Sequence, residues 1–537
     1  MEKKRVGIVG AGISGLAACK HAAERGFRPV VFEASAGVGG LWAHTPASTK
    51  LQSPTLDFTF SDFPWPPDVT EIFPRHDQVQ NYLESYARHF DLLRWIKFRS
   101  SVVSIDLVGT SEEEIAAWDL WAGNGEAFGG VAKGEWHLTV QREGDPSTEI
   151  YRVDFLILCI GRFSDAPNFP NFARRGAAQV FDGMTMHSME YSNMDDAGAA
   201  ALVRGKRVTV VGSGKTAFEI ASECADANGV GLPCTMILQT KRWFVDEPTA
   251  MRFRLFGHFY RTRFAELLVH KPEEGVFLSL LATFLAPLRW LFNKITERHF
   301  TRNMPLMKKH GMVPDHSFFQ GYSSCVIGML PEKFYERVEE GSITLKRPTT
   351  SALCKDGLVI DKGEVVHSDL VIFATGFKGD QKLRNIFVSK WFQQIVAGSS
   401  TPMAPLFREC IHPQIPQLAI VGFTESFSNL HAADMRSKWI SHFLDGRFKL
   451  PSISSMEKSV TEWQKFFKKN ILELEKYTTR TDREFFRGSC IGTVNIWYND
   501  LLCRDMGYSS RRKKGFLAEW FQQYNPVDYA GIYSKGN

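Results

Sequence analysis

The sequence predicts an α/β protein with two parallel-sheet units, the second of them inserted into the first. The chain has 537 residues, well beyond the roughly 250–300 residues at which a single hydrophobic core stops growing. Two glycine-rich turns occur about 200 residues apart, and each lies between an apolar, strand-like run and a helical stretch. Apolar residues make up 44% of the chain and charged residues 23%, a mixture sufficient for large folded cores.

The first unit begins near the N-terminus, where residues 5–9 are apolar and the following stretch has helical character up to Gly26. Gly10, Gly12 and Gly15 lie between strand and helix in the pattern G-x-G-x-x-G. The first glycine permits a tight turn, the second lets backbone amides approach a pyrophosphate, and the third lets the helix pack closely on the strand. The helix N-terminus then directs its positive dipole at the phosphates. We therefore expect a Rossmann-like dinucleotide site here.

A second apolar strand, residues 29–32, ends at Glu33, which follows the last glycine of this pattern by 18 residues. An acidic side chain at that place accepts hydrogen bonds from the ribose hydroxyls of a dinucleotide. Glu33 is therefore a predicted cofactor contact.

The glycine pattern recurs as Gly212-x-Gly214-x-x-Ala217, again after an apolar strand and before a helical stretch. The next strand ends without an acid and is followed by Lys241 and Arg242. Two cations in place of the carboxylate favour a 2′-phosphate, so this site is predicted to bind NADPH rather than NADH. A solvated basic loop is the alternative. The expected contacts are Gly212, Ser213, Gly214, Ala217, Thr240, Lys241 and Arg242.

Two dinucleotide sites in one chain suggest a bound flavin and an exchangeable nicotinamide, arranged for hydride transfer. The first site is then expected to hold FAD. Two further apolar strands, residues 155–161 and 369–377, each end in a glycine turn and are expected to close a nucleotide-binding unit. An ordinary core strand followed by a turn is the alternative for each. The additional predicted cofactor contacts are Gly40, Leu41, Trp42, Thr375 and Gly376.

Charge and cysteine content exclude other classes of protein. The net charge of +5, from 64 basic and 59 acidic residues, is a small excess over a large surface and argues against a nucleic-acid partner. The nine cysteines are odd in number and include no C-x-x-C pair. This pattern predicts reduced thiols, with neither a zinc site nor a disulfide framework.

The most apolar stretch, residues 276–291, is shorter than the roughly 20 residues that a spanning helix needs, and it contains Pro287 and Arg289. We expect a buried or interfacial helix there rather than an integral membrane segment. The strand-like N-terminus leaves no room for a signal peptide. The expected location is the cytoplasm, with peripheral attachment to the endoplasmic reticulum as the alternative. Nothing in the sequence indicates an oligomeric state.

Residues 181–191, Phe-Asp-Gly-Met-Thr-Met-His-Ser-Met-Glu-Tyr, lie between the two glycine patterns and fit F-x-G-x-x-x-H-x-x-x-Y. This segment resembles the identifying motif of the flavin-containing monooxygenases. The Thr-Gly-Phe segment that ends at Phe377 and the Phe-Pro-Trp-Pro segment 63–66 are also similar to segments of that family, and all occur in the family's order. Residues 50–66 look most like the plant branch, which includes N-hydroxypipecolate synthase.

The resemblance implies an enzyme in which NADPH reduces FAD and the reduced flavin takes up O₂ as a C4a-hydroperoxide. The substrate would be a small amine, amino acid or sulfur compound, oxygenated at a nucleophilic nitrogen or sulfur. The finer expectation is N-hydroxylation of pipecolate in plant defence. Four alternatives stay open: a thioether S-oxygenase, a Baeyer–Villiger monooxygenase, a disulfide reductase, and a non-catalytic NADPH or flavin sensor. Tyr191 and Ser192 stand where Baeyer–Villiger enzymes carry Trp and then Pro or Asp, and no cysteine pair has the spacing of a reductase.

The resemblance also implies two catalytic candidates. His187, within the motif, would couple nicotinamide binding to flavin chemistry at the junction of the domains, and a purely structural histidine is the alternative. Gln52 lies where the animal and bacterial branch has an asparagine that steadies the flavin peroxide. Its amide can donate a similar hydrogen bond, and a loop amide bonded to backbone is the alternative.

These motifs predict the domain map. We expect a discontinuous FAD-binding domain at residues 1–175 and 345–450, an NADPH-binding domain at 176–344, and a C-terminal helical tail at 451–537. Residues 243–331 form an aromatic and basic extension of the NADPH-binding domain. The tail is expected to begin as a helix and to end as a surface element.

Overall fold

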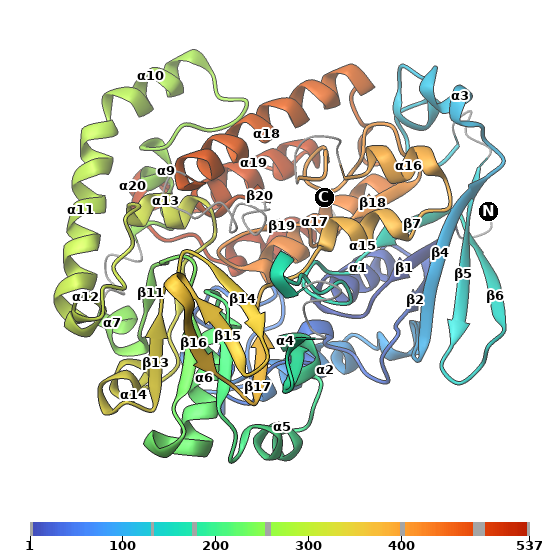
Figure 1. Cartoon of the computed structure of the whole chain (residues 1–537). Coiled ribbons are helices and arrows are strands. Elements are labelled where there is room, and N and C mark those ends of the chain that lie inside the picture. Colours follow the sequence, from blue (N-terminus) through green and yellow to red (C-terminus); the bar gives the residue numbers. More distant parts are fainter. Residues whose placement is uncertain are drawn as a thin grey trace.

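Two five-stranded parallel sheets form the framework of the protein (Figure 1). The computed structural model describes residues 4–129, 134–173, 180–252, 259–397, 403–475 and 489–533. The first sheet contains β1 (Arg5–Val9), β2 (Arg28–Phe32), β3 (Ile96–Lys97), β7 (Phe155–Leu158) and β18 (Leu418–Ile420), in the order β18-β7-β1-β2-β3. The second contains β8 (Met184–His187), β9 (Val208–Val211), β10 (Cys234–Ile237), β13 (Ile343–Lys346) and β17 (Leu370–Phe373), in the order β13-β10-β9-β17-β8.

The central strands of both sheets are continuous apolar runs because both of their faces are covered. All four residues of β7, β9 and β17 are buried. Parallel neighbours need a crossover connection, and helices supply it: α1 (Ile13–Glu24) joins β1 to β2, and α6 (Lys215–Asn228) joins β9 to β10. The buried helix α17 (Asn429–Leu444) packs against α1 on the first sheet.

The second unit extends further along the chain than the sequence predicted. β17 pairs with β9 and β8, and a small antiparallel sheet precedes it, made of β14 (Ser351–Cys354), β15 (Gly357–Ile360) and β16 (Glu364–His367). The chain rejoins the first sheet only at β18. The predicted return to the first unit at residue 345 is therefore wrong, because a buried apolar strand looks the same in sequence whichever sheet it joins.

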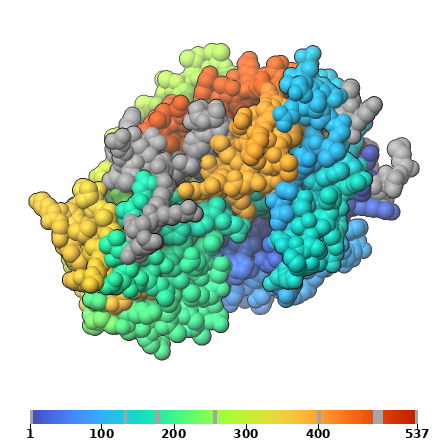
Figure 2. Space-filling view, turned by 45° about the vertical axis from the view of Figure 1, so that its right-hand side comes forward, coloured from blue at the N-terminus to red at the C-terminus, as the bar shows by residue number. Residues whose placement is uncertain are grey.

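A second layer covers the first sheet. It consists of the antiparallel strands β4 (Ser100–Val108), β5 (Glu135–Arg142) and β6 (Thr148–Val153), and the helices α15 (Gly379–Asn385) and α16 (Lys390–Ile395). Helix α2 (His76–His89) packs instead in the core that contains α1 and α17. On the face shown in Figure 2, the orange residues of α15 and α16 lie beside the cyan to teal residues of the antiparallel strands. The backbone of Ile105 in β4 accordingly bonds to that of Ile386 at 2.8 Å.

Short helices make up the extension of the second unit. They are α7 (Glu247–Arg252), α9 (Arg263–Leu267), α10 (Val276–Phe284), α11 (Ala286–Asn303), α12 (Pro305–Lys309) and α13 (Phe318–Ser323). The strands β11 (Phe244–Val245) and β12 (Gly328–Met329) pair in parallel and bring the two ends of the extension together. The helices α4 (Ser188–Ser192), α5 (Asp196–Val203) and α14 (Phe334–Glu340) complete the described helices of this unit.

The apolar stretch 276–291 forms α10 and the start of α11, at the left edge of Figure 1. It is not buried: Val276, Phe277 and Phe284 are 78%, 76% and 80% exposed. The expectation of a buried helix is thus wrong, and the expectation of an interfacial helix stays a prediction. Within the described ranges no single helix is long and apolar enough to cross a membrane, although α10 and α11 together, bent by 51°, pass the same test.

The C-terminal tail completes the core of the first unit. It contains α18 (Ile453–Glu475), β20 (Ser489–Cys490), α19 (Asn495–Asp505) and α20 (Phe516–Phe521). The predicted helix at its start is confirmed by α18. Tyr498, Tyr529 and Ile532 are buried in the same hydrophobic core as β1 and α17. The expectation of a surface element therefore holds for the exposed residues 514–517 and is wrong for Tyr524, Tyr529 and Ile532, which pack inward.

One disulfide joins the extension to the tail, contrary to the expectation of reduced cysteines. Cys325, which follows α13, is bonded to Cys490 of β20. β20 in turn pairs with β19 (Thr424–Glu425). The two cysteines are 165 positions apart, and no sequence spacing reports a contact that depends on how two units pack. The remaining cysteines are free and most of them are buried.

Candidate functional site

A large cavity of about 1580 Å³ lies between the carboxyl ends of the two sheets. Residues at the ends of β1, β2 and β7 line one side, and residues at the ends of β9, β10 and β17 line the other. This edge of a parallel sheet is where helix N-termini converge and ligands bind. The predicted contacts that line it are Gly10, Gly12, Glu33, Gly40, Leu41, Trp42, Gln52, Gly212, Ser213, Gly214, Thr240, Arg242, Thr375 and Gly376.

The turn between β1 and α1 forms the first phosphate cradle. Gly10 has a φ of +100°, and a Cβ there would lie 2.5 Å from the carbonyl oxygen of Cys159. A Cβ on Gly15 would lie 1.8 Å from the carbonyl oxygen of Gly10, so α1 can approach β1 only because Gly15 has no side chain. Helix α1 begins at Gly12 without a side-chain cap, which leaves its first N–H groups to bind a pyrophosphate.

Glu33 lies at the end of β2 and is only 8% exposed. Its Oε2 accepts a hydrogen bond from the N–H of Ala11 at 2.6 Å, and its Oε1 accepts one from the N–H of Ser35 at 2.8 Å. Each carboxylate oxygen can accept a second hydrogen bond. Glu33 can therefore fix the glycine turn and still bind a ribose hydroxyl.

The turn between β9 and α6 forms the second phosphate cradle. Helix α6 begins at Gly214, again without a side-chain cap. The hydroxyl of Ser213 accepts hydrogen bonds from the backbone N–H groups of Gln239 at 2.9 Å and Thr240 at 3.1 Å, which holds the loop after β10 against the turn. Ala217 is fully buried, and a Cβ on Gly212 would lie 3.2 Å from its own Cβ. Ala217 thus supports the cradle without lining the cavity.

Of the two cations predicted to recognise a 2′-phosphate, the structure brings only Arg242 to the cavity wall. The Nζ of Lys241 forms an ion pair with Asp315 at 3.0 Å, outside the lining. The role of Lys241 therefore stays a prediction, because its ammonium group is paired with Asp315 and the residue does not line the cavity. Arg242 remains the candidate for phosphate recognition.

His187, at the end of β8, does not line the cavity but packs against a residue that does. Its ring lies edge to face with that of Phe377, with the centroids 5.2 Å apart. Its Nδ1 accepts a hydrogen bond from the N–H of Met189 at 3.1 Å and so caps α4. Burial lowers the pKa of His187 to about 4, so the ring is neutral at pH 7. This geometry suits a positioning residue, and the coupling role stays a prediction.

Gln52 lines the cavity where the first unit meets the extension. Its Oε1 accepts a hydrogen bond from the N–H of Met329 at 3.2 Å. The alternative interpretation, a loop amide bonded to backbone, therefore describes the side-chain oxygen of Gln52. No hydrogen bond from the amide NH₂ group is found among the described residues, so Gln52 retains its donors for a ligand.

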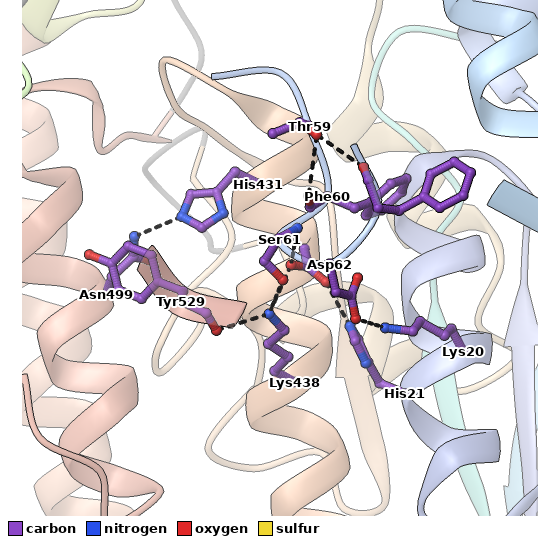
Figure 3. Close-up of polar contacts among 12 residues, drawn as sticks. Lys20, His21, Thr59, Phe60, Ser61, Asp62, His431, Lys438, Asn499 and Tyr529 are labelled. Atoms are coloured by element: carbon purple, nitrogen blue, oxygen red, sulfur yellow. Dashed lines mark hydrogen bonds and ion pairs between the residues drawn. The ribbon is translucent and has the colours of Figure 1, made fainter. Parts of the chain in front are cut away.

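Buried charges anchor the loop that follows Gln52 (Figure 3). Asp434 and Lys438 of α17 are fully buried and form an ion pair at 3.1 Å. Asp434 also lies 2.7 Å from the Nε2 of His21 in α1, and Lys438 bonds to the hydroxyl of Ser61. Burial raises the pKa of Asp434, but the charge of Lys438 and the bond to His21 outweigh it and hold that pKa well below the usual range.

Sequence reasoning missed this network. A second ion pair within it joins Lys20 of α1 to Asp62 in the same loop. One signal was available, because Asp62 belongs to the Ser-Asp-Phe-Pro-Trp-Pro segment that carries part of the family resemblance. The sequence offered no such signal for Asp434 and Lys438, since two charges four residues apart on a helix usually lie on a solvated face.

Known proteins are similar to this chain in sequence and in fold. A family model described as "Flavin-binding monooxygenase-like" matches residues 3–486. The chain is 36% identical over 535 residues to probable flavin-containing monooxygenase 1 of Arabidopsis thaliana, with 98% of this chain and 96% of that protein covered. It resembles the solved structure of cyclohexanone monooxygenase from Rhodococcus sp. Phi1 bound to NADP⁺, with a TM-score of 0.64, 17% identity, and 94% and 97% of the two chains covered. It also resembles S-allyl-L-cysteine S-oxygenase from Allium sativum, with a TM-score of 0.54, 18% identity, and 94% and 89% covered.

These comparisons confirm the predicted fold and the predicted family. The residues present fit two dinucleotides, because both α1 and α6 begin at a glycine without a side-chain cap and both turns open into one cavity. The chain therefore belongs to the flavin-binding monooxygenase-like family, and it is an enzyme that uses FAD, NADPH and O₂.

Proposed function

We propose that this monooxygenase N-hydroxylates a small amino acid, with pipecolate as the candidate, and that the product serves plant defence. The resemblance of residues 50–66 to the plant branch supports this choice. The structural observation that carries the proposal is the shared cavity into which both phosphate cradles open. That cavity continues past the cradles to Tyr260, Tyr322 and Phe427, which offer walls for a small substrate.

Bound FAD supplies the oxygen chemistry once NADPH has reduced it. The chain positions both cofactors and excludes water from the reacting centre. The first N–H groups of α1 and α6 bind the two pyrophosphates, and Glu33 binds a ribose. Gln52 keeps its oxygen on the Met329 N–H, so its NH₂ group can donate to an oxygen atom at the reacting centre.

Oxygenation of a thioether amino acid is the second candidate. The fold is shared with S-allyl-L-cysteine S-oxygenase over 94% of this chain. Nitrogen and sulfur act as nucleophiles toward the same oxygen donor, so no different side chain is needed for sulfur. A ketone is disfavoured, because Tyr191 and Ser192 replace the residues typical of Baeyer–Villiger enzymes.

The test is incubation of the FAD-loaded enzyme with NADPH and O₂ and, separately, pipecolate, S-allyl-L-cysteine and cyclohexanone, followed by mass spectrometry. Substrate-dependent NADPH consumption and a pipecolate product with one added oxygen atom on nitrogen support the proposal. Exclusive formation of a sulfoxide would establish the second candidate instead, and a lactone would indicate Baeyer–Villiger activity. No substrate-dependent oxidation in any reaction would refute all three substrate classes tested here.

We further propose that the protein works in the cytoplasm and attaches peripherally to an anionic membrane surface such as that of the endoplasmic reticulum. The exposed apolar side chains of α10 support this location. Lys294, Arg298 and Arg302 form an exposed basic row at intervals of four residues along the adjoining α11. An apolar face next to a basic row is typical of helices that lie in a membrane interface.

A further inference from the structure

A buried arginine that forms no ion pair with a carboxylate of the described residues is part of the cavity wall. Arg436 of α17 is 1% exposed and lines the cavity. Its Nε donates to the hydroxyl of Tyr498 at 2.9 Å, and one Nη donates to the carbonyl oxygen of Thr424 at 3.1 Å. The other Nη is buried and has no hydrogen-bond partner within the described part of the chain. No carboxylate there forms an ion pair with this guanidinium.

This arrangement is unfavourable unless a ligand completes it. An arginine keeps its charge at any physiological pH, and burying a charge without a counter-ion is costly. The buried carboxyl of Glu409 is already engaged, because it accepts a hydrogen bond from the hydroxyl of Thr424. Burial raises the pKa of Glu409 to about 7, which reduces the negative charge available to Arg436 near neutral pH.

A second unpaired polar group lines the same cavity. Ser426 is 9% exposed, and its buried hydroxyl has no hydrogen-bond partner among the described residues. It follows Thr424, to whose carbonyl Arg436 is bonded, by two residues. Both residues line the cavity and each has an unused hydrogen-bond donor, and a carboxylate can accept hydrogen bonds from a guanidinium and from a hydroxyl.

The segment that carries Ser426 connects the first phosphate cradle to Gln52. At its start, a Cβ on Gly422 would lie 3.0 Å from the hydroxyl of Ser14 in the first turn of α1. At its end, the carbonyl oxygen of Phe427 accepts a hydrogen bond from the hydroxyl of Ser53 at 2.6 Å, next to Gln52. An anion bound in this part of the wall would therefore lie between the first phosphate cradle and Gln52.

We propose that Arg436 and Ser426 form a subsite that binds the carboxylate of an amino-acid substrate and selects it over amines that lack a carboxylate. The subsite deepens the proposed function and rests on it. A carboxylate supplies a counter-ion and accepts a hydrogen bond from the unused N–H, whereas an amine without a carboxylate offers neither. Holding the carboxylate fixes the ring and presents the nitrogen to the cofactor.

The test compares pipecolate with piperidine, which share the ring and the amine but differ in the carboxylate. In Arg436→Gln we expect the KM for pipecolate to rise about 10- to 100-fold, the loss expected for a charge-assisted pair. The KM for piperidine should stay within about twofold of wild type, since it has no group for the guanidinium to bind. Ser426→Ala should also raise the KM for pipecolate relative to the KM for piperidine, but by a smaller factor.

Arg408→Gln is the matched control for the loss of a buried arginine. Arg408 is paired with Asp505 at 2.8 Å and Glu273 at 3.3 Å and lies outside the cavity lining. Its substitution should leave the preference between the two amines unchanged. FAD content and the flavin absorbance spectrum establish that each variant is folded.

Two outcomes would overturn the subsite. One is an unchanged KM for pipecolate in Arg436→Gln. The other is an equal loss for both amines with an altered spectrum of the reduced flavin, which would assign Arg436 to the cofactor. If the wild-type enzyme oxygenates neither amine, the proposed function fails and calorimetry with pipecolate still tests the subsite. Binding to the FAD-loaded wild type that disappears in Arg436→Gln supports it, and absent or equal binding refutes it.

Discussion

Gln52 is fixed by its oxygen, and its NH₂ group makes no hydrogen bond among the described residues. We expect Gln52→Ala to oxidise NADPH while releasing roughly two- to tenfold more hydrogen peroxide per NADPH, because a donor to the reacting oxygen is lost. The measurement is the ratio of peroxide formed to NADPH consumed. Gln52→Glu is the matched variant, since it keeps an oxygen for the Met329 N–H but loses the NH₂ donors. If Gln52→Glu forms no more peroxide per NADPH than the wild type, the hydrogen bond to Met329 matters and the NH₂ group does not.

His412 provides a pH test of burial that is separate from catalysis. It is 5% exposed; its Nδ1 accepts the N–H of Gln414 at 3.1 Å, and its Nε2 lies 3.2 Å from the carbonyl oxygen of Ile395. Burial lowers the pKa of His412 to about 4. The unfolded chain therefore binds a proton that the folded chain does not, and the contribution of His412 to stability is lost as the pH falls from about 6.5 towards 4.

The stability difference between wild type and His412→Gln should accordingly depend on pH. We expect the advantage of wild type in free energy of unfolding to shrink by about 2 kcal/mol between pH 7 and pH 5. Urea titrations of the FAD-loaded proteins at both pH values measure it. A difference that stays constant, or that grows towards pH 5, would contradict this assignment.

Single residues were predictable from sequence where a local backbone requirement identified them. Gly10, Gly15 and Glu33 serve one turn, and the pattern that surrounds them is contiguous in the chain. Lys241 and Arg436 were not predictable, because each depends on the side chain it meets across the fold. Lys241 forms an ion pair with Asp315, whereas Arg436 forms none with any carboxylate of the described residues.

At the scale of elements, the bent pair α10 and α11 presents the most exposed apolar face of the extension. We expect replacement of Val276, Phe277, Leu280 and Phe284 by serine to lower the fraction bound to vesicles of phosphatidylserine and phosphatidylcholine at least about tenfold. Each apolar side chain withdrawn from water contributes on the order of 1–2 kcal/mol to interfacial binding. Co-sedimentation at low and high salt measures it.

The control for that experiment replaces apolar residues that are equally exposed but lie elsewhere. Ile150 and Val230 are each 63% exposed, and Ile150→Ser with Val230→Ser should leave vesicle binding unchanged. Higher salt should weaken binding of the wild type, because the basic row on α11 faces the anionic lipid. Equal sedimentation of the serine variant and the wild type would refute the membrane proposal.

Elements were predictable where their own pattern sufficed. The strands β1, β9 and β17 and the crossover helices were predicted because apolar runs next to glycine turns have a local cause. The sheet to which β17 belongs was not predictable. All residues of this strand are buried, and its pairing with β9 depends on tertiary packing. The disulfide between Cys325 and Cys490 was not predicted for the same reason, because it forms only where α13 meets β20.

At the scale of the whole molecule, the tail and the first unit share one hydrophobic core. Ile491, Val494 and Tyr498 are fully buried in the core that also contains β1. We expect a chain that ends at residue 475 to lose most of its bound FAD and its solubility, because removing the tail exposes that core. FAD absorbance per protein and size-exclusion chromatography measure both.

Phe516→Ser is the control for the tail. Phe516 is 73% exposed, so the substitution should leave FAD content at the wild-type level. A shortened chain that remains soluble with full FAD content would show that the tail is dispensable for the first unit.

The sequence by itself determined the two dinucleotide-binding units, their cofactors and the family, because glycine turns and apolar strands are set by neighbours along the chain. Only the tertiary structure decided where the second unit ends, which cation faces the cavity, and that α17 places Arg436 in its wall. The physical reason is that backbone geometry is a local requirement, whereas burial and charge pairing depend on residues that are distant in sequence. Arg436 lies 421 positions after Gly15, yet the two contribute to one site.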